Sequence, residues 1–326
     1  MKIASFFSGG GGLDKGFEKA GFHTLWANEY DRTIWDTFQT NFPNTILDKR
    51  SITAISSGDI PDVDGIIGGP PCQSWSAAGS QRGIDDKRGK LFFDYIRILK
   101  TKQPKFFLAE NVAGILQPKH VLAFANIIQA FQEAGYTLSY KLLNANNYDV
   151  PQDRLRVIII GYRCDLGKKF EFPASQNYKP VLKDAISDLP LATPAKEANK
   201  TNEVLETLNH EYMTGGFSTI FMSRNRVRAW HEPSFTIQAS GRHAPLHPQA
   251  PKMELVGQDK RIFVAGKEDL YRRLSVRECA RIQTFPDDFI FKYQNINDGY
   301  KMVGNAVPVN FAYHLAKKIY DDLVVN

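Results

Sequence analysis

Apolar runs and amphipathic segments alternate along the first 160 residues of the chain. Several apolar runs have the length and flanking residues of buried strands: residues 3–7, 24–28, 65–67, 106–109, 138–143 and 157–160. The segments between them repeat apolar positions every three or four residues, as amphipathic helices do: residues 13–20, 31–42, 90–100 and 121–131. Strands that alternate with helices predict an α/β fold with a largely parallel sheet and right-handed crossovers.

The pattern changes near residue 168. Prolines punctuate the following stretch, which has no sustained apolar period, and helical patterns return only at residues 275–283 and 309–323. We therefore expect a main α/β domain formed by residues 1–168 together with residues 272–326. A smaller, irregular domain, residues 169–271, is expected to be inserted between these two parts.

The composition is that of a globular protein. Of the 326 residues, 43% are hydrophobic and 23% are charged, which excludes a disordered or fibrous chain. The net charge of +6 hints at a polyanionic partner. No apolar run approaches the ~20 residues of a membrane span, so we expect a cytoplasmic protein without a membrane partner. Three widely spaced cysteines argue against disulfides and a metal site, and Cys164 and Cys279 are expected to be structural.

The first strand runs directly into the glycine tract of residues 9–12, which opens a helix. Glycines there let the backbone approach a ligand and present a helix N-terminus to it. Glu29 ends the next strand, where nucleotide-binding α/β folds place a carboxylate for ribose hydroxyls. The tract lacks the Gly-Lys-Ser/Thr ending of a P-loop, which disfavours ATP and GTP. A dinucleotide and S-adenosylmethionine both remain possible from these residues alone.

Chemically distinctive residues lie at the ends of three other strands. Cys72 comes after two prolines at the rigid end of a strand, a setting typical of a reactive thiol rather than a packing one. Glu110 ends the next strand, and adjacent parallel strands would bring it beside Cys72, partly desolvated and able to donate a proton. For Glu110 taken alone, a helix N-cap or a salt bridge is the stronger interpretation. Arg154 and Arg156 share one face of a further strand, where an ordinary exposed strand start is the alternative interpretation.

These residues resemble the motifs of the DNA (cytosine-5)-methyltransferases. The matching motifs are, in chain order, Phe7-Ser8-Gly9 with Gly11, Pro70-Pro71-Cys72-Gln73, Glu110-Asn111-Val112, residues 152–156, and Gly304-Asn305-Ala306-Val307-Pro308. They cover nearly the whole chain in the order and spacing of the family. The resemblance implies a Rossmann-like, S-adenosylmethionine-dependent methyltransferase fold, with residues 169–271 as a target-recognition domain.

The resemblance also implies a mechanism. The Cys72 thiolate would attack carbon 6 of cytosine, Glu110 would give or share a proton at ring nitrogen 3, and carbon 5 would accept the methyl group of S-adenosyl-L-methionine. Arg154 and Arg156 would orient the base, which must first be flipped out of the duplex. The implied cofactor-binding residues are Phe7, Ser8, Gly9, Gly11, Leu13, Asn28, Glu29, Pro70, Leu91, Asn305 and Ala306.

Double-stranded DNA is the implied partner. The basic residues of the inserted region are candidate readers of guanine edges or, equally, phosphate clamps: Arg224, Arg226, Arg228 and Arg242. Trp75, Arg82 and Arg88 lie in a polar loop after Cys72 that is suited to closing over DNA. Residues 221–228 and 238–242 are similar to the HaeIII-type modification methylases, which implies a GGCC target.

One position departs from the family pattern. An acid usually precedes the isoleucine after the third strand and contacts the adenine amine, but here Ser51 precedes Ile52, so weaker cofactor binding is expected. Alternatives are the same chemistry on tRNA, a nicotinamide-dependent oxidoreductase, which leaves Cys72 and Glu110 without roles, and a non-catalytic DNA-binding module. We expect a monomer that is paired functionally, without a stable complex, with a restriction endonuclease.

Overall fold

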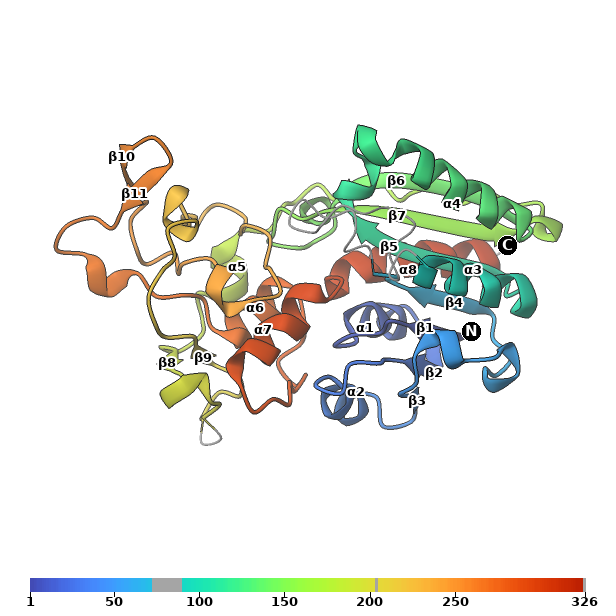
Figure 1. Ribbon diagram of the computed structural model, residues 1–326, viewed down its shortest axis with the longest axis horizontal. Coiled ribbons are helices and arrows are strands. Elements are labelled where there is room, and N and C mark those ends of the chain that lie inside the picture. The colour runs from blue at the N-terminus through green and yellow to red at the C-terminus, as the bar shows by residue number, and fades with distance from the viewer. Residues whose placement is uncertain (72–89, 203–204, 325–326) are drawn as a thin grey trace.

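The computed structural model describes residues 1–71, 90–202 and 205–324 (Figure 1). Its strands are β1 (Lys2–Phe6), β2 (His23–Asn28), β3 (Ile46–Asp48), β4 (Gly65–Gly68), β5 (Phe106–Val112), β6 (Tyr136–Asn144), β7 (Leu155–Arg163), β8 (Thr193–Pro194), β9 (Glu211–Tyr212), β10 (Glu254–Gly257) and β11 (Lys260–Ile262). Its helices are α1 (Gly12–Lys19), α2 (Trp35–Asn41), α3 (Lys90–Lys102), α4 (Val121–Glu133), α5 (Leu182–Ile186), α6 (Val276–Ile282), α7 (Ile296–Asn305) and α8 (Val309–Val324). Every apolar run predicted as a strand forms one, and the α/β prediction is confirmed.

The main sheet has seven strands in the order β3-β2-β1-β4-β5-β7-β6. The pairs from β3 to β5 are parallel, as predicted, whereas β7 is antiparallel to both β5 and β6. Only one short 3-10 helix, Ala145–Asn147, lies between β6 and β7, so the chain turns back on itself instead of crossing over. The sheet is therefore mostly parallel, with an antiparallel hairpin at one edge.

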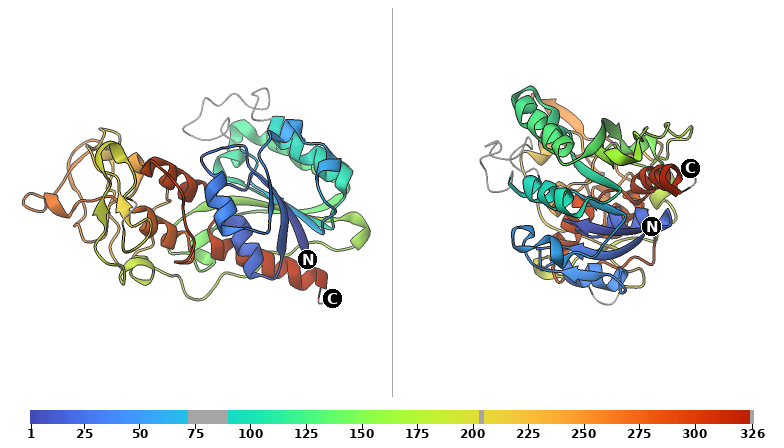
Figure 2. Two further views of the ribbon diagram at one scale, coloured as in Figure 1. Left: turned by 90° about the horizontal axis from the view of Figure 1, so that it is seen from below. Right: turned by 90° about the vertical axis from the view of Figure 1, so that its right-hand side faces the viewer.

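Helices cover both faces of this sheet (Figures 1 and 2). Phe106 and Leu108 of β5 pack in one core with α1 and α8, whereas Phe107 and Ala109 pack in a second core with α3 and α4. Burial on both faces explains why these strands are continuously apolar in the sequence. Among the described residues, no helix combines the length and the apolarity needed to cross a bilayer.

Some short elements differ from the prediction. The edge strand β3 has three residues, of which Ile46 is 66% exposed, so it carries little apolar signal. The α7 segment was not predicted, and it contains two glycines. The predicted helix over residues 31–42 begins only at Trp35, because the Asp31 carboxylate accepts hydrogen bonds from Thr33 and forms a turn. Cys279 is buried as expected, but the prediction for Cys164 is wrong: it is exposed in the turn after β7.

The inserted region lies beside one end of the α/β part (Figure 1). It contains the short helix α5 and two small sheets, β8-β9 and β10-β11, joined by long irregular segments. Its own small core includes Phe221, Val227 and Leu246. A larger core joins α5, α6 and α7 to Phe38 and Phe42 of the α2 region, so apolar packing connects the inserted region to the main sheet through α6 and α7.

Candidate active site

A pocket of about 650 Å³ opens at the carboxyl ends of β1, β2, β4 and β5. Open α/β sheets bind ligands at this edge, and the volume suits a cofactor-sized molecule. The predicted cofactor residues that line it are Phe7, Ser8, Gly9, Leu13, Asn28, Glu29, Pro70, Leu91, Asn305 and Ala306. Gly11 is not part of the lining, and instead forms the start of α1.

The loop from β1 to α1 has an unusual backbone. Phe7, Gly9 and Gly11 have φ angles of 53°, 54° and 81°, all in the left-handed region. Gly11 has a second requirement, because a Cβ atom there would lie 2.3 Å from the ring of Phe42. Phe7 has a side chain, so its left-handed backbone conformation is strained, and strain of this kind in a non-glycine residue often accompanies a binding site. The segment that lines the pocket between β1 and α1 thus has a backbone conformation that most side chains disfavour.

Glu29 forms one end of the pocket. One of its carboxylate oxygens accepts a hydrogen bond from the Gly9 amide (2.9 Å), and the other accepts one from the Asp31 amide (2.7 Å). Burial raises the pKa of Glu29, and these two amide donors partly offset that effect. Asn28 donates to the Asp48 and Arg50 carbonyls and so fixes the segment that leads to the pocket residue Ser51.

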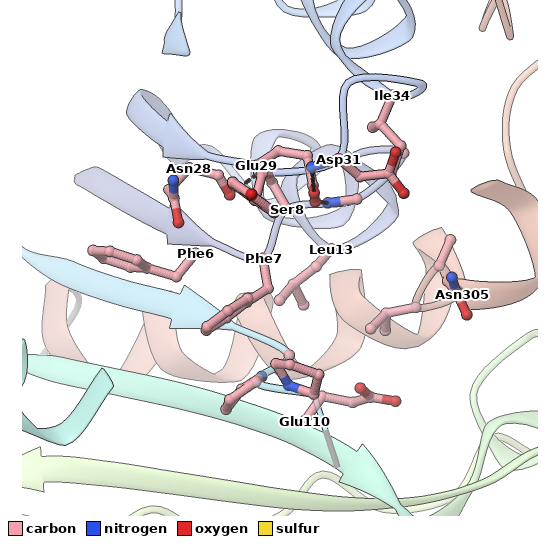
Figure 3. A pocket seen from close by; sticks show the side chains of 18 of the residues that line it. Phe6, Phe7, Ser8, Leu13, Asn28, Glu29, Asp31, Ile34, Glu110 and Asn305 are labelled. Atoms are coloured by element: carbon pink, nitrogen blue, oxygen red, sulfur yellow. Dashed lines mark hydrogen bonds between the residues drawn. The ribbon is translucent and has the colours of Figure 1, made fainter. Parts of the chain in front are cut away.

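Glu110 lies on the opposite side of the pocket from this group (Figure 3). Parallel pairing of Gly68 with Ala109 brings the segment after β4 beside it, as predicted for Cys72. A Cβ atom on Gly69 would lie 3.3 Å from Glu110 Oε2, and the Asn111 side chain donates to the Pro70 carbonyl (3.1 Å). Cys72 itself lies outside the described residues, as do Trp75, Arg82 and Arg88. The segment that leads to the predicted nucleophile is therefore in contact with the predicted acid.

Arg154, which immediately precedes β7, and Arg156, which lies in it, have different surroundings. The Nε of Arg156 is 2.7 Å from Glu110 Oε1, since the antiparallel register places it opposite Val112. Arg154 is 1% exposed and donates to three backbone carbonyls: Ile237, Gly304 and Ala306. Arg156 therefore holds the acid, whereas Arg154 joins the inserted region and the C-terminal motif to β7.

Two other buried polar residues support this junction: Gln152, which begins the motif of residues 152–156, and Gln283, which was not predicted from the sequence. The Gln152 side chain accepts from the Ile237 amide (2.8 Å) and donates to Gln283, which in turn donates to the Val303 carbonyl (2.8 Å). Asp31, Ile34 and Met302 also line the pocket. The only sequence feature that could have indicated Asp31 as a pocket residue is its position two residues after Glu29. Met302 belongs to α7, the helix that the apolar pattern did not predict.

The arginines of the inserted region fall into two groups. Arg224 and Arg242 are exposed, and their guanidinium groups have no ion-pair partner within the described ranges. Arg226 donates to the Phe221 and Ile220 carbonyls and lies over the Phe221 ring. Arg228 is paired with Asp153 and with Glu232. Of these four arginines, only Arg224 and Arg242 could contact a new ligand without losing the contacts described for the other two.

Comparisons with known proteins agree with this geometry. The profile of the C-5 cytosine-specific DNA methylase family matches residues 1–321. The Type II methyltransferase M.MthTI of Methanothermobacter thermautotrophicus is 60% identical over 99% of this chain and 98% of its own length. M.FnuDI of Fusobacterium nucleatum is 58% identical over 99% and 95%. A prophage-encoded DNA modification methyltransferase structure from E. coli has a TM-score of 0.75 at 23% identity, with 100% of both chains covered, which shows a common fold.

Proposed function

The chain belongs to the C-5 cytosine-specific DNA methylase family, and from that premise we propose that it methylates a flipped-out cytosine within double-stranded GGCC. It is a DNA (cytosine-5-)-methyltransferase of the restriction–modification type, and its cofactor is S-adenosyl-L-methionine. The observation that carries the proposal is a single pocket with Glu29 at one end and the Glu110–Arg156 pair at the other.

The pocket residues fit this cofactor. Glu29 is an acid placed for ribose hydroxyls, Gly9 leaves room for close approach, and Asn305 and Ala306 also line the pocket. When bound, the cofactor supplies the methyl group. Ser51 lies at the place where the family usually has an acid, so it offers a neutral hydroxyl to the adenine end.

The chain's own groups account for the remaining chemistry. Arg156 orients Glu110, which gives or shares a proton at cytosine nitrogen 3 while the Cys72 thiolate forms a bond to carbon 6. This addition makes carbon 5 nucleophilic enough to take the methyl group. Loss of the carbon 5 proton and of the thiolate then restores the aromatic ring. Arg154 contributes by holding β7 against the C-terminal motif.

Target reading is assigned to residues 169–271. A base in a duplex cannot present both faces to a thiolate and a methyl donor, so it must leave the stack. Arg224 and Arg242 are our first candidates for guanine edges because they are exposed and unpaired in the described structure. Arg226 and Arg228 remain candidates that would exchange protein contacts for DNA. Similarity of residues 221–228 and 238–242 to HaeIII-type enzymes supports GGCC.

We further propose that the enzyme acts as a monomer and protects DNA from a partner endonuclease without forming a stable complex with it. RNA is the less favoured substrate, because the matching family is defined by DNA. The loop with Arg82 and Arg88 is included in the proposal as a DNA contact on sequence grounds alone.

Transfer of a tritiated methyl group tests the proposal. We expect transfer to a GGCC duplex, none to a duplex of scrambled sequence or to tRNA, and protection of GGCC in the DNA of expressing cells. Cys72→Ser should abolish transfer, and Glu110→Gln should slow it about 10²- to 10⁴-fold. Equal transfer to both duplexes would refute the GGCC target, and transfer to tRNA alone would refute DNA as the substrate.

A further inference from the structure

We propose that Asp153 and Arg228 are positioning residues whose ion pair fixes residues 221–242, the proposed DNA-reading segment, against catalytic strand β7. The proposal rests on the proposed function, because it takes residues 169–271 to be the reader. It gives Arg228 a different role from the base or phosphate contact expected from sequence. The inference follows from contacts that Arg228 and Asp153 already make in the protein alone.

Arg228 is held on three sides. Its Nη2 is 3.3 Å from Asp153 Oδ2, and its Nη1 is 3.6 Å from Glu232 Oε1. The guanidinium carbon also lies 4.3 Å from the centre of the Phe235 ring. The side chain is 27% exposed. Two carboxylates and a ring thus neutralise and cover this arginine, unlike the exposed Arg224 and Arg242.

Backbone contacts continue the attachment beyond the ion pair. The Asp153 amide donates to the Ser234 carbonyl (2.9 Å), and the Ser234 amide donates to the Pro151 carbonyl (2.9 Å). The Thr236 hydroxyl donates to the Asp153 carbonyl (2.6 Å). The reading segment therefore runs alongside the residues that precede β7, and the ion pair lies at one end of this contact.

Residues that follow Asp153 contact the pocket wall and the predicted acid Glu110. Arg154 donates to the Ile237 carbonyl (3.0 Å) at the other end of the same contact, and to the Ala306 carbonyl (3.0 Å) of the pocket wall. Arg156, two residues further, holds Glu110. A shift of the reading segment away from Asp153 would therefore move β7 and the acid together. Displacements of about 1 Å at such sites can cost 10²-fold in rate.

The alternative role makes an opposite prediction. If Arg228 served as a DNA contact, Asp153 would compete with DNA for it. Neutralising Asp153 would then release a positive charge, tighten DNA binding and steepen its salt dependence. If the pair positions β7, neutralising either partner loses the same contact and slows turnover without improving binding.

The test uses Asp153→Asn, Arg228→Gln and the double variant, with Asp165→Asn as the matched control. Asp165 pairs with Arg163 (2.7 Å) beyond the far end of β7, so the control removes a similar carboxylate away from the pocket. For each protein we would measure kcat and KM on GGCC duplex and on genomic DNA, the DNA Kd at several salt concentrations, and thermal unfolding.

We expect each single variant to lower kcat about 5- to 10-fold, with KM and Kd for DNA within about twofold of wild type. The double variant should be no slower than the slower single variant, because one contact is lost in all three. Asp153→Glu, which keeps the carboxylate, should recover most of kcat, and the control should match wild type. Recovery by Asp153→Glu separates positioning from a general loss of fold.

Tighter DNA binding by Asp153→Asn with unchanged kcat would overturn the proposal and return Arg228 to the DNA contacts. Additive losses in the double variant would overturn it as well. Failure of the proposed GGCC target is recognised separately, in the wild type, by equal transfer to GGCC and scrambled duplexes. The comparison of kcat among variants on genomic DNA would still test the ion pair in that case.

Discussion

Single side chains are expected to determine how this protein responds to pH and to its cofactor. Asp14 lies in the first turn of α1 and is fully buried between the helix and the first two strands. Burial raises the pKa of Asp14 to about 7, although the hydroxyls of Ser5 and Thr24 lower it in part. The folded protein therefore keeps the proton on Asp14 up to about pH 7, whereas the unfolded chain loses that proton near pH 4.

Asp14→Asn should stabilise the protein relative to wild type at pH 8, and should do so much less at pH 4. In the wild type the carboxyl group keeps its proton when folded but loses it near pH 4 when unfolded, so stability falls as the pH rises from about 4 to about 7. A shift of that size corresponds to about 4 kcal/mol. The free energy of unfolding from urea titrations at several pH values measures it. Asp36→Asn, at an exposed acid of α2, is the control; the same pH trend in both variants would refute the assignment.

Ser51→Asp should tighten cofactor binding about tenfold. A carboxylate at the pocket wall would accept a hydrogen bond from the adenine amine, and bonds to charged groups are worth about 1.5–3 kcal/mol. Isothermal titration with S-adenosyl-L-methionine gives the Kd directly, without turnover. Ala54→Asp adds the same charge at an exposed position nearby and should leave the Kd unchanged. An unchanged Kd for Ser51→Asp would mean that the adenine amine points elsewhere.

At the scale of elements, apolar pattern and contact distance decide what the sequence can predict. Residues 106–109 predict a strand easily because both faces of β5 are buried. Glu110 follows from this strand by parallel pairing, so its place beside the segment leading to Cys72 was predictable. The partners of Arg154 were not, since they lie 83 and 150 residues away and are backbone atoms. No side-chain pattern records such contacts, so the sequence indicates only the base-orienting role of Arg154, which also lines the pocket and whose role there stays a prediction.

Helix α7 approaches the backbone at Gln238 too closely for any side chain at Gly304. A Cβ atom there would lie 2.3 Å from the backbone carbonyl carbon of Gln238. Gly304→Ala should therefore lower the free energy of unfolding by about 1–3 kcal/mol, because a backbone segment must move. Gly216→Ala, where a Cβ would meet open space, should change it little. Chemical denaturation compares the two, and equal stability of both variants would contradict this account of the junction.

The whole molecule carries a charge of +6, to which the exposed arginines of the inserted region contribute. Arg242→Gln should weaken binding to GGCC duplex by about 1–3 kcal/mol. If the side chain reads a base, preference at one base pair relaxes. If it holds a phosphate, binding weakens on all sequences, and the slope of the logarithm of the DNA-binding constant against the logarithm of salt concentration falls in magnitude by about 1. Lys105→Gln, at the amino end of β5 away from the pocket, is the control. Unaltered DNA binding by Arg242→Gln would remove this residue from the interface.

The wall of the pocket formed by Met302, Asn305 and Ala306 has a consequence for the timing of synthesis. These residues are made after almost everything else in the pocket, including the β1–α1 loop and Glu110. A nascent chain still attached to its ribosome before this stretch emerges has Arg154 without two of its carbonyl partners. Methyl transfer therefore has to await synthesis of this stretch, and a truncated product lacking it should be inert.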